Sequence, residues 1–203
     1  MRIVIFVEGG DRGDLRAKMR RSFQALFLKA GIQARFELCG RRQKAYEDFC
    51  RALKSPFSDD EIYFLLVDSE DPISNRITET EEFWRHVADR EGDKWTKPDF
   101  ANQNHLLFMT TCTETWIMAD SEAIDKIFKR DVQHSALFSP ASLETRGRAE
   151  VLKALEHATR NCKASYEKGR HSCDLIEALN PQKLEKLSHW NRCVQILQEA
   201  SAG

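Results

Sequence analysis

The hydrophobic pattern divides the chain into short buried strands and amphipathic helices. Uninterrupted apolar runs at residues 3–7 (IVIFV, after Arg2) and 63–67 (YFLLV) are typical of strands buried on both faces of a parallel sheet. Residues 32–38 (IQARFEL) and 105–111 (HLLFMTT) predict two further strands. Residues 11–30 repeat apolar positions at helical spacing and stop at Gly31. Strand, helix and strand form a βαβ unit, so we expect parallel strands with a right-handed crossover.

The rest of the pattern is mostly helical. Helices are predicted at residues 43–53, 79–90, 123–128, 148–159, 172–179, 181–187 and 190–200, with Thr113 capping another helix and a loop at 131–142. The predicted fold class is α/β, with a mainly parallel, Rossmann-like sheet of four strands flanked by helices. Residues 1–130 would form the core, with an insertion at 72–104, and residues 131–203 a helical extension packed on it.

Carboxylates follow two of these strands directly. Glu8 ends the first strand and precedes Gly9-Gly10, while Asp68, Glu70 and Asp71 follow the strand at 63–67. Because parallel strands present their carboxyl ends at one edge of a sheet, we expect these acids to meet there. Clustered acids repel one another, and a hard cation, Mg²⁺ or Mn²⁺, would hold them together. An acidic loop or helix cap remains the alternative.

Basic residues occupy two segments that could face the same edge. Arg41, Arg42 and Lys44 follow the second strand, at the start of the helix predicted at 43–53. A cation at the start of a helix opposes the helix dipole. Gly169 interrupts the helical pattern within KGRH at residues 168–171. Phosphate binding is the functional interpretation of both segments, since arginine offers a fork of donors to phosphate oxygens. A solvated helix start and a plain basic turn are the alternatives.

Composition narrows the choice of function. Among 203 residues, 31 Lys and Arg stand against 32 Asp and Glu, for a net charge of −1. No global basic field would steer nucleic acid, so any binding must use local patches. No apolar run approaches the roughly 20 residues of a membrane span, and nothing at the start is typical of a signal peptide. Six cysteines without a Cys-x-x-Cys pair fit reduced thiols, so we expect a cytoplasmic protein without membrane contact.

The two acidic segments resemble the motifs of the TOPRIM superfamily, which includes topoisomerases, primases and OLD-type nucleases. Glu8-Gly9 matches the first motif, and Asp68 matches the first acid of the second, whereas Glu70 stands where that motif has a second Asp. Nearly the whole chain is also similar to a TOPRIM-like family of unknown function, through CGRRQKAYEDF (39–49), HLLFMTTCTETWIMAD (105–120) and KGRHS (168–172).

The resemblance implies a metal-dependent nuclease that cleaves phosphodiester bonds in DNA or RNA. In that case Glu8, Asp68 and Glu70 would be catalytic metal ligands, and Asp71 or Glu114 would complete a second metal site. Lys168 would stabilise charge near the scissile phosphate. The residues expected to contact phosphates are Arg41, Arg42, Arg170 and His171.

The resemblance also implies an AAA or ABC-type ATPase partner in a prokaryotic antiviral defence system. This chain has no Gly-x-x-x-x-Gly-Lys loop, so ATP chemistry would belong to the partner. The alternative function is a catalytically inactive TOPRIM-like subunit that binds or regulates an ATPase complex, which the longer side chain of Glu70 would favour. A Mg²⁺-dependent phosphotransfer on a small nucleotide is a third possibility.

Overall fold

A parallel sheet forms the centre of the protein. We describe it from a computed structural model, which covers residues 1–10, 13–55, 60–73 and 82–202. The sheet has four strands in the order β2-β1-β3-β4, and every neighbouring pair is parallel. The strands are β1 (Arg2–Val7), β2 (Ala34–Leu38), β3 (Glu61–Asp68) and β4 (Leu106–Met109). The predicted α/β class and parallel sheet are confirmed.

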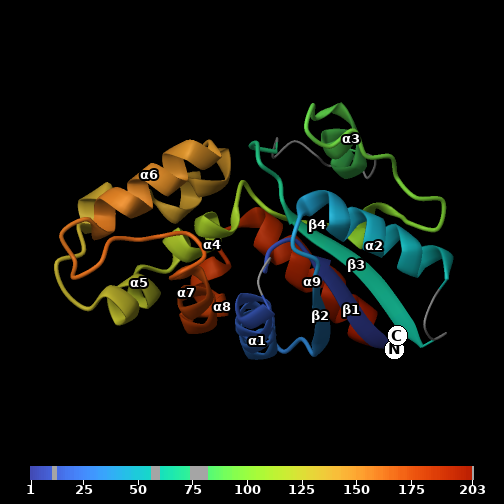
Figure 1. Cartoon of the computed structure of the whole chain (residues 1–203), viewed down its shortest axis with the longest axis horizontal. Helices are drawn as coiled ribbons and strands as arrows, with labels where there is room; N and C mark the ends of the chain where they lie inside the picture. The colour runs from blue at the N-terminus through green and yellow to red at the C-terminus, as the bar shows by residue number, and fades with distance from the viewer. Residues whose placement is uncertain (11–12, 56–59, 74–81, 203) are drawn as a thin grey trace.

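Both faces of the sheet are covered by helices (Figure 1). Alternate residues of β1 enter two separate apolar clusters: Ile3, Ile5 and Val7 join one, while Val4 and Phe6 join the other. Helices α1 (Gly13–Lys29) and α9 (Ser188–Ala202) pack on the first face, and α2 (Arg42–Lys54) and α3 (Glu82–Asp89) pack on the second. Burial on both sides explains why β1 has no polar residue within its apolar run.

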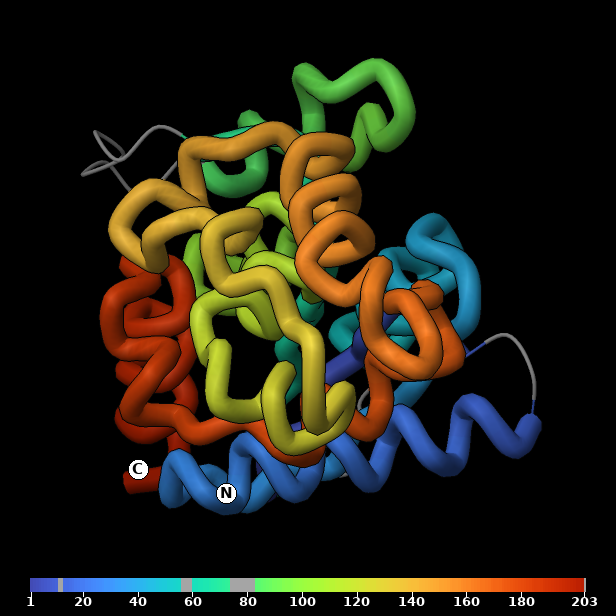
Figure 2. The backbone as a smooth tube through the Cα atoms, turned by 90° about the vertical axis from the view of Figure 1, so that its left-hand side faces the viewer, coloured from blue at the N-terminus to red at the C-terminus, as the bar shows by residue number. Residues whose placement is uncertain are grey.

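The C-terminal half is a set of short helices beside the sheet. They are α4 (Thr113–Ala119), α5 (Ser121–Phe128), η2 (His134–Ala136), η3 (Pro140–Thr145), α6 (Arg148–Thr159), α7 (Ser172–Ala178) and α8 (Pro181–Leu184). Helix α1 runs beneath the C-terminal helices and contacts α7 and α8 (Figure 2). The predicted loop at 131–142 is partly wrong, because two short 3-10 turns lie there, and the predicted helix at 181–187 ends at Leu184.

The predicted extension packs on the core through aromatic side chains. Trp190 of α9 lies 4.9 Å from Trp116 of α4 and 5.4 Å from Phe27 of α1, measured between ring centroids. Both tryptophans are essentially inaccessible to solvent. Aromatic burial of this size is among the largest contributions to a core, so the C-terminal helices and the sheet share one hydrophobic cluster.

Two predicted strands are longer than the observed ones. Ile32 lies before β2, where its amide donates to the Phe27 carbonyl oxygen at 2.9 Å and so completes the turn after α1. His105 ends the 3-10 turn η1 (Gln103–His105), and β4 ends at Met109. Apolar residues in a buried turn mimic a strand in the sequence. The first residues of the predicted helices at 11–30 and 79–90 lie outside the described part of the chain.

Candidate metal centre

Three carboxylates meet at the carboxyl edge of the sheet. Glu8 follows β1, Asp68 is the last residue of β3, and Glu70 lies two residues further on. Strands β1 and β3 are neighbours, so their ends share this edge. One carboxylate oxygen from each acid lies within 4.8 Å of the other two. The predicted convergence of these acids is confirmed, and their role as metal ligands remains a prediction.

The turn after β3 brings Glu70 back toward Asp68. Glu70 has a positive φ of 67°, in the left-handed region that few non-glycine residues adopt. The Ser69 amide donates to the Met109 carbonyl oxygen at 3.2 Å, and the Glu70 amide donates to that of Thr111 at 2.8 Å. These bonds to the chain following β4 hold the turn in place. A strained residue of this kind is common at functional sites.

Glycines hold the loop that follows Glu8. Gly9 has a φ of 110°, and an added Cβ atom would lie 2.9 Å from the Met19 sulfur. The Gly9 and Gly40 main chains exchange two hydrogen bonds, at 2.6 and 2.9 Å, and so join the loops after β1 and β2. A side chain at Gly9 would be strained and crowded at once. This accounts for the glycine directly after the acid.

Asp68 is the most buried of the three acids, with 2% of its surface exposed. Its Oδ1 accepts hydrogen bonds from the Thr113 amide at 2.8 Å and the Thr113 hydroxyl at 3.0 Å. Burial and the charge of Glu8 raise the pKa of Asp68 well above its usual value, against the opposing charge of Lys168. The prediction that Thr113 caps a helix is wrong, since Cys112 holds the cap position and the Thr113 hydroxyl binds Asp68 instead.

Each acid has a cationic partner from another segment. Arg42 Nη1 donates to Glu8 at 3.2 Å and to the main-chain oxygen of Asp68. Lys168 Nζ lies 3.8 Å from Asp68 Oδ2. Arg148 Nη1 donates to Glu70. The sequence reasoning missed Arg148, although an arginine in the first turn of a helix opposes the dipole and is a weak signal of another partner.

Glu114 supports the lysine rather than joining the three converging acids. It is fully buried, and it accepts hydrogen bonds from the Tyr166 hydroxyl at 2.7 Å and from Lys168 Nζ at 3.2 Å. Burial lowers the pKa of Lys168, but the charges of Glu114 and Asp68 outweigh burial and raise it. Lys168 is therefore held as a cation beside Asp68. The role of Tyr166 had no signal in the sequence beyond its position near the basic turn.

Asp71 lies apart from the three acids. Its side chain is 68% exposed and lies 3.5 Å from Arg90 Nε. Asp14 lies in the first turn of α1, as expected of an acid near a helix N-terminus. Asp11, three residues earlier in the chain, is outside the described residues.

The four residues expected to contact phosphates differ in their surroundings. Arg41 is exposed at the N-cap position of α2, and the Arg170 side chain is 66% exposed and 3.5 Å from Glu167. Arg42 is engaged by the acids beside it. His171 Nδ1 accepts a hydrogen bond from the Glu167 amide at 3.0 Å, so this ring helps to close its own turn.

Comparison with known proteins gives one match. Residues 8–198 match the family described as a domain of unknown function, DUF4276. The chain belongs to this family. No curated protein and no solved structure matches the DUF4276 chain significantly. The matched range includes all three converging acids together with Arg148 and Lys168.

The residues of this DUF4276 chain fit a hard divalent cation. The three converging groups are all carboxylates, which are the oxygen ligands that Mg²⁺ and Mn²⁺ prefer. Burial raises the pKa of Asp68, and the repulsion between Glu8 and Asp68 adds to this effect. A divalent cation would relieve this repulsion. Glu8, Asp68 and Glu70 are thus the residues that would hold it.

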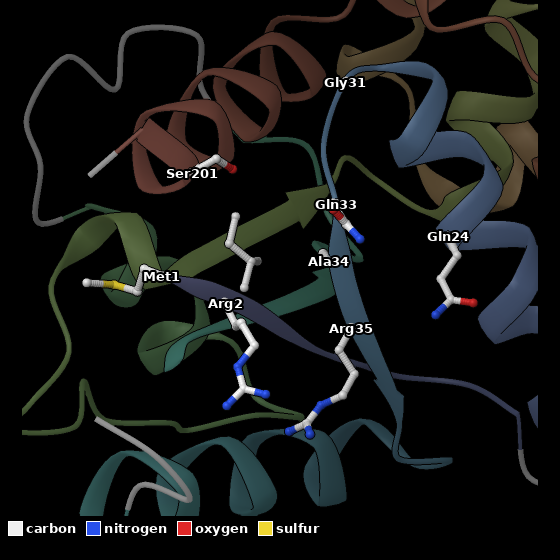
Figure 3. A pocket seen from close by; sticks show the side chains of 9 residues that line it. Met1, Arg2, Gln24, Gly31, Gln33, Ala34, Arg35 and Ser201 are labelled. Atoms are coloured by element: carbon white, nitrogen blue, oxygen red, sulfur yellow. The ribbon is translucent and has the colours of Figure 1, made fainter. Parts of the chain in front are cut away.

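Well-formed hollows lie on parts of the surface that do not include these acids. One hollow of about 520 Å³ lies at the opposite edge of the sheet, where β1 and β2 begin (Figure 3). Met1, Gln33, Arg35 and Ser201 are among its lining residues. A large hollow is the usual first candidate for a ligand site, but this one contains none of the converging carboxylates. Among the residues that the structure describes, no helix has the length and apolar character needed to cross a membrane.

Proposed function

We propose that this DUF4276 protein is a metal-dependent nuclease that cleaves phosphodiester bonds in DNA or RNA. The observation that carries the proposal is the convergence of Glu8, Asp68 and Glu70 within 4.8 Å, with Lys168 beside Asp68. Phosphodiester cleavage needs an activated water and compensation of negative charge on the phosphate. Three carboxylates and an adjacent cation supply groups for both tasks.

The proposed roles follow the positions of the side chains. Glu8, Asp68 and Glu70 would hold Mg²⁺ or Mn²⁺. Such a metal lowers the pKa of bound water and neutralises charge on phosphate oxygens. Lys168, which Glu114 holds in its charged form, would donate to a phosphate oxygen near Asp68. In an alternative role, Glu8, whose side chain is 16% exposed, would accept a proton from the attacking water.

The substrate and setting are part of the same proposal. Arg41 and Arg170 are exposed and would contact the nucleic-acid backbone as a local patch, because the net charge of −1 provides no general attraction. An AAA or ABC-type ATPase partner in antiviral defence is proposed from the TOPRIM resemblance. All six cysteines are free thiols, which supports a cytoplasmic setting.

A second candidate function is a non-catalytic module that binds or regulates an ATPase. The observation that favours it is the pairing of each converging acid with a cation of the chain itself, through Arg42, Arg148 and Lys168. Such pairing compensates the negative charge without a metal. In this case the cluster would be a structural salt-bridge network that joins the sheet to α6 and to the turn before α7.

Metal titration followed by a cleavage assay separates the two candidates. Wild type should bind Mn²⁺ or Mg²⁺ in a calorimeter and cleave DNA or RNA in its presence. Asp68→Asn preserves the shape and the acceptor for Thr113, but it should abolish both binding and cleavage. Asp174→Asn is the matched control, because Asp174 pairs with Lys18 and is not one of the three converging acids, and it should retain both. Absence of metal binding by wild type would favour the regulatory module.

A further inference from the structure

Asp93 holds two arginines beside the acid cluster. It lies in the insertion after α3, and its side chain is only 1% exposed. Its two oxygens accept hydrogen bonds from Arg42 Nε at 2.7 Å and Arg42 Nη2 at 2.8 Å, in a bidentate arrangement. Arg90 Nη1 lies 3.1 Å from Asp93 Oδ2. A buried carboxylate bound in this way fixes the orientation of a planar guanidinium.

Both arginines also contact the converging acids. Arg42 Nη1 donates to Glu8 at 3.2 Å and to the main-chain oxygen of Asp68, so it joins the ends of β1 and β3. Arg90 Nη2 lies 4.0 Å from Glu70. Asp93 itself is separate from the group of three carboxylates that could share an ion. It therefore acts on the cluster through the two guanidinium groups.

The donors of Arg42 are almost fully used. A guanidinium has five N–H groups, and four of them account for the bonds to Asp93, Glu8 and the Asp68 carbonyl oxygen. This leaves one donor, which is too few for the bidentate hydrogen bonding to phosphate that the sequence suggests for Arg42. The geometry fits a group that orients the acids better than one that binds substrate.

Aromatic contacts pack around this arrangement. The Trp95 ring stacks on Tyr46 of α2 at 4.6 Å with an interplanar angle of 3°, and its indole nitrogen donates to Gln43 at 2.7 Å. The Arg42 guanidinium lies over the Trp95 ring at 4.8 Å. Burial opposes ionisation of Asp93, but Arg42 and Arg90 outweigh it and hold its pKa below the usual range.

We propose that Asp93 is a positioning residue for the metal centre, which acts through Arg42 on Glu8 and Asp68 and through Arg90 on Glu70. The proposal rests on the proposed metal-dependent function. It assigns to the insertion a part in assembling the site, whereas a purely structural ion pair would only fasten the insertion to α2. Outer residues that orient metal ligands typically contribute a factor of about 10 to 100 in metal affinity.

Calorimetric titration of Mn²⁺ into Asp93→Asn tests the proposal. We expect affinity to fall about 10-fold or more relative to wild type, with the melting temperature of the metal-free protein measured in parallel to verify folding. Asp48→Asn is the matched control. Asp48 also holds two cations, Lys44 at 2.5 Å and Arg51 at 2.8 Å, but away from the acid cluster. Its Mn²⁺ affinity should equal that of wild type.

A double-mutant cycle shows whether Asp93 acts through the arginines. Combining Asp93→Asn with Arg42→Gln should weaken binding by much less than the product of the two single effects, because residues in one network are coupled. A second cycle with Arg90→Gln should show weaker coupling, since Arg90 lies further from its acid. Asp93→Glu keeps the charge and should restore most of the affinity. Additivity in both cycles would overturn the proposal.

The possible outcomes separate this proposal from the proposed function. If wild type binds Mn²⁺ and folded Asp93→Asn binds it equally well, the positioning role is overturned and the nuclease proposal stands. If wild type binds neither Mn²⁺ nor Mg²⁺, both proposals fail. If Asp93→Asn does not fold, Arg42→Gln and Asp93→Glu decide the question, and wild-type affinity in Arg42→Gln overturns the positioning role.

Discussion

The protein buries carboxylates in two regions and satisfies them in two different ways. In the helical half, Glu144 accepts hydrogen bonds from the Ser188 and His189 amides at 2.7 and 3.0 Å. Asp120 similarly accepts from the Ala123 and Asn180 amides at 3.1 and 2.8 Å. These acids bind the first turns of helices, where free amides need acceptors.

At the sheet edge, by contrast, the acids face one another and side-chain cations. Glu8, Asp68 and Glu70 gather within 4.8 Å, and burial together with the charge of Glu8 raises the pKa of Asp68. Backbone amides are fixed partners that nothing needs to replace, whereas arginine and lysine side chains can exchange a carboxylate for another anion. The difference teaches that burial alone does not mark a functional acid. Asp68 also accepts a hydrogen bond from the Thr113 amide, so the feature that distinguishes it from Glu144 and Asp120 is its pairing with a side-chain cation and with other acids.

The largest effect is expected at Lys168, if the sheet edge is catalytic. Lys168→Met should lower the cleavage rate about 10²–10³-fold, because it removes one donor positioned for charge that develops on the phosphate. Single-turnover cleavage with saturating Mn²⁺ measures this. Lys183→Met is the control, since Lys183 pairs with Glu122 on the helical half, and it should cleave at the wild-type rate. Equal cleavage rates in Lys168→Met and Lys183→Met would show that Lys168 at the sheet edge contributes no more to cleavage than Lys183 in the helical half.

The next effect is on stability and concerns Glu144. Glu144→Ala should lower the free energy of unfolding by about 2–3 kcal/mol, because it leaves two amides at the start of α9 without their acceptor. Urea denaturation measures the loss. Mn²⁺ affinity should be unchanged, since this acid lies outside the converging group. A change in metal affinity without a change in stability would contradict the structural assignment.

The helical half should also respond to acid through His189. Burial, with the charges of Arg192 and His86, lowers the pKa of His189 to about 4, against roughly 6.5 for the free side chain. Between these values the unfolded chain binds a proton that the folded chain excludes. The stability that neutral His189 contributes is therefore fully present above about pH 6.5 and is lost as pH falls toward 4, by about 3 kcal/mol in total.

His189→Phe isolates this contribution. The ring packs edge-on against Phe83, at 5.9 Å between centroids, and its Nε2 has no partner among the described residues, so phenylalanine suits the space. On acidification wild type should lose more unfolding free energy than the variant. The difference in unfolding free energy between the two should therefore change between neutral pH and pH 4. Parallel pH profiles would show that His189 does not titrate in this range.

The smallest effect is expected at an exposed ion pair that joins α1 to α7. Lys18 and Asp174 lie 2.8 Å apart, and their side chains are 40% and 45% exposed. Asp174→Asn should change the unfolding free energy by less than about 1 kcal/mol, because solvent screens exposed pairs. The same urea measurement sets the baseline against which the loss in Glu144→Ala is judged. If Asp174→Asn lost as much unfolding free energy as Glu144→Ala, burial would not explain the stabilisation by Glu144.

Local sequence patterns were enough to predict the sheet and the position of its acids. Apolar runs that end in Glu8 and Asp68 mark both the strands and the residues at their ends. Parallel pairing then requires those ends to lie at one edge. This inference needs only the neighbours of each residue in the chain, which is why it succeeded.

The partners of those acids depend on contacts between distant segments. Arg148 lies 78 residues from Glu70, and Asp93 lies 51 residues from Arg42. No periodicity connects such pairs, so neither Arg148 nor Asp93 was predicted. The prediction for Thr113 is wrong for the same reason. Its hydroxyl donates a hydrogen bond to Asp68, 45 residues away, instead of capping the helix.

The position of the chain ends has a practical consequence. Met1 and Ser201 line the same hollow, at the edge of the sheet where the strands begin (Figure 3). An affinity handle or a fluorophore attached at either end would therefore stand on the side of the sheet away from Glu8, Asp68 and Glu70. Protein immobilised through either end would leave the acidic edge open to solution.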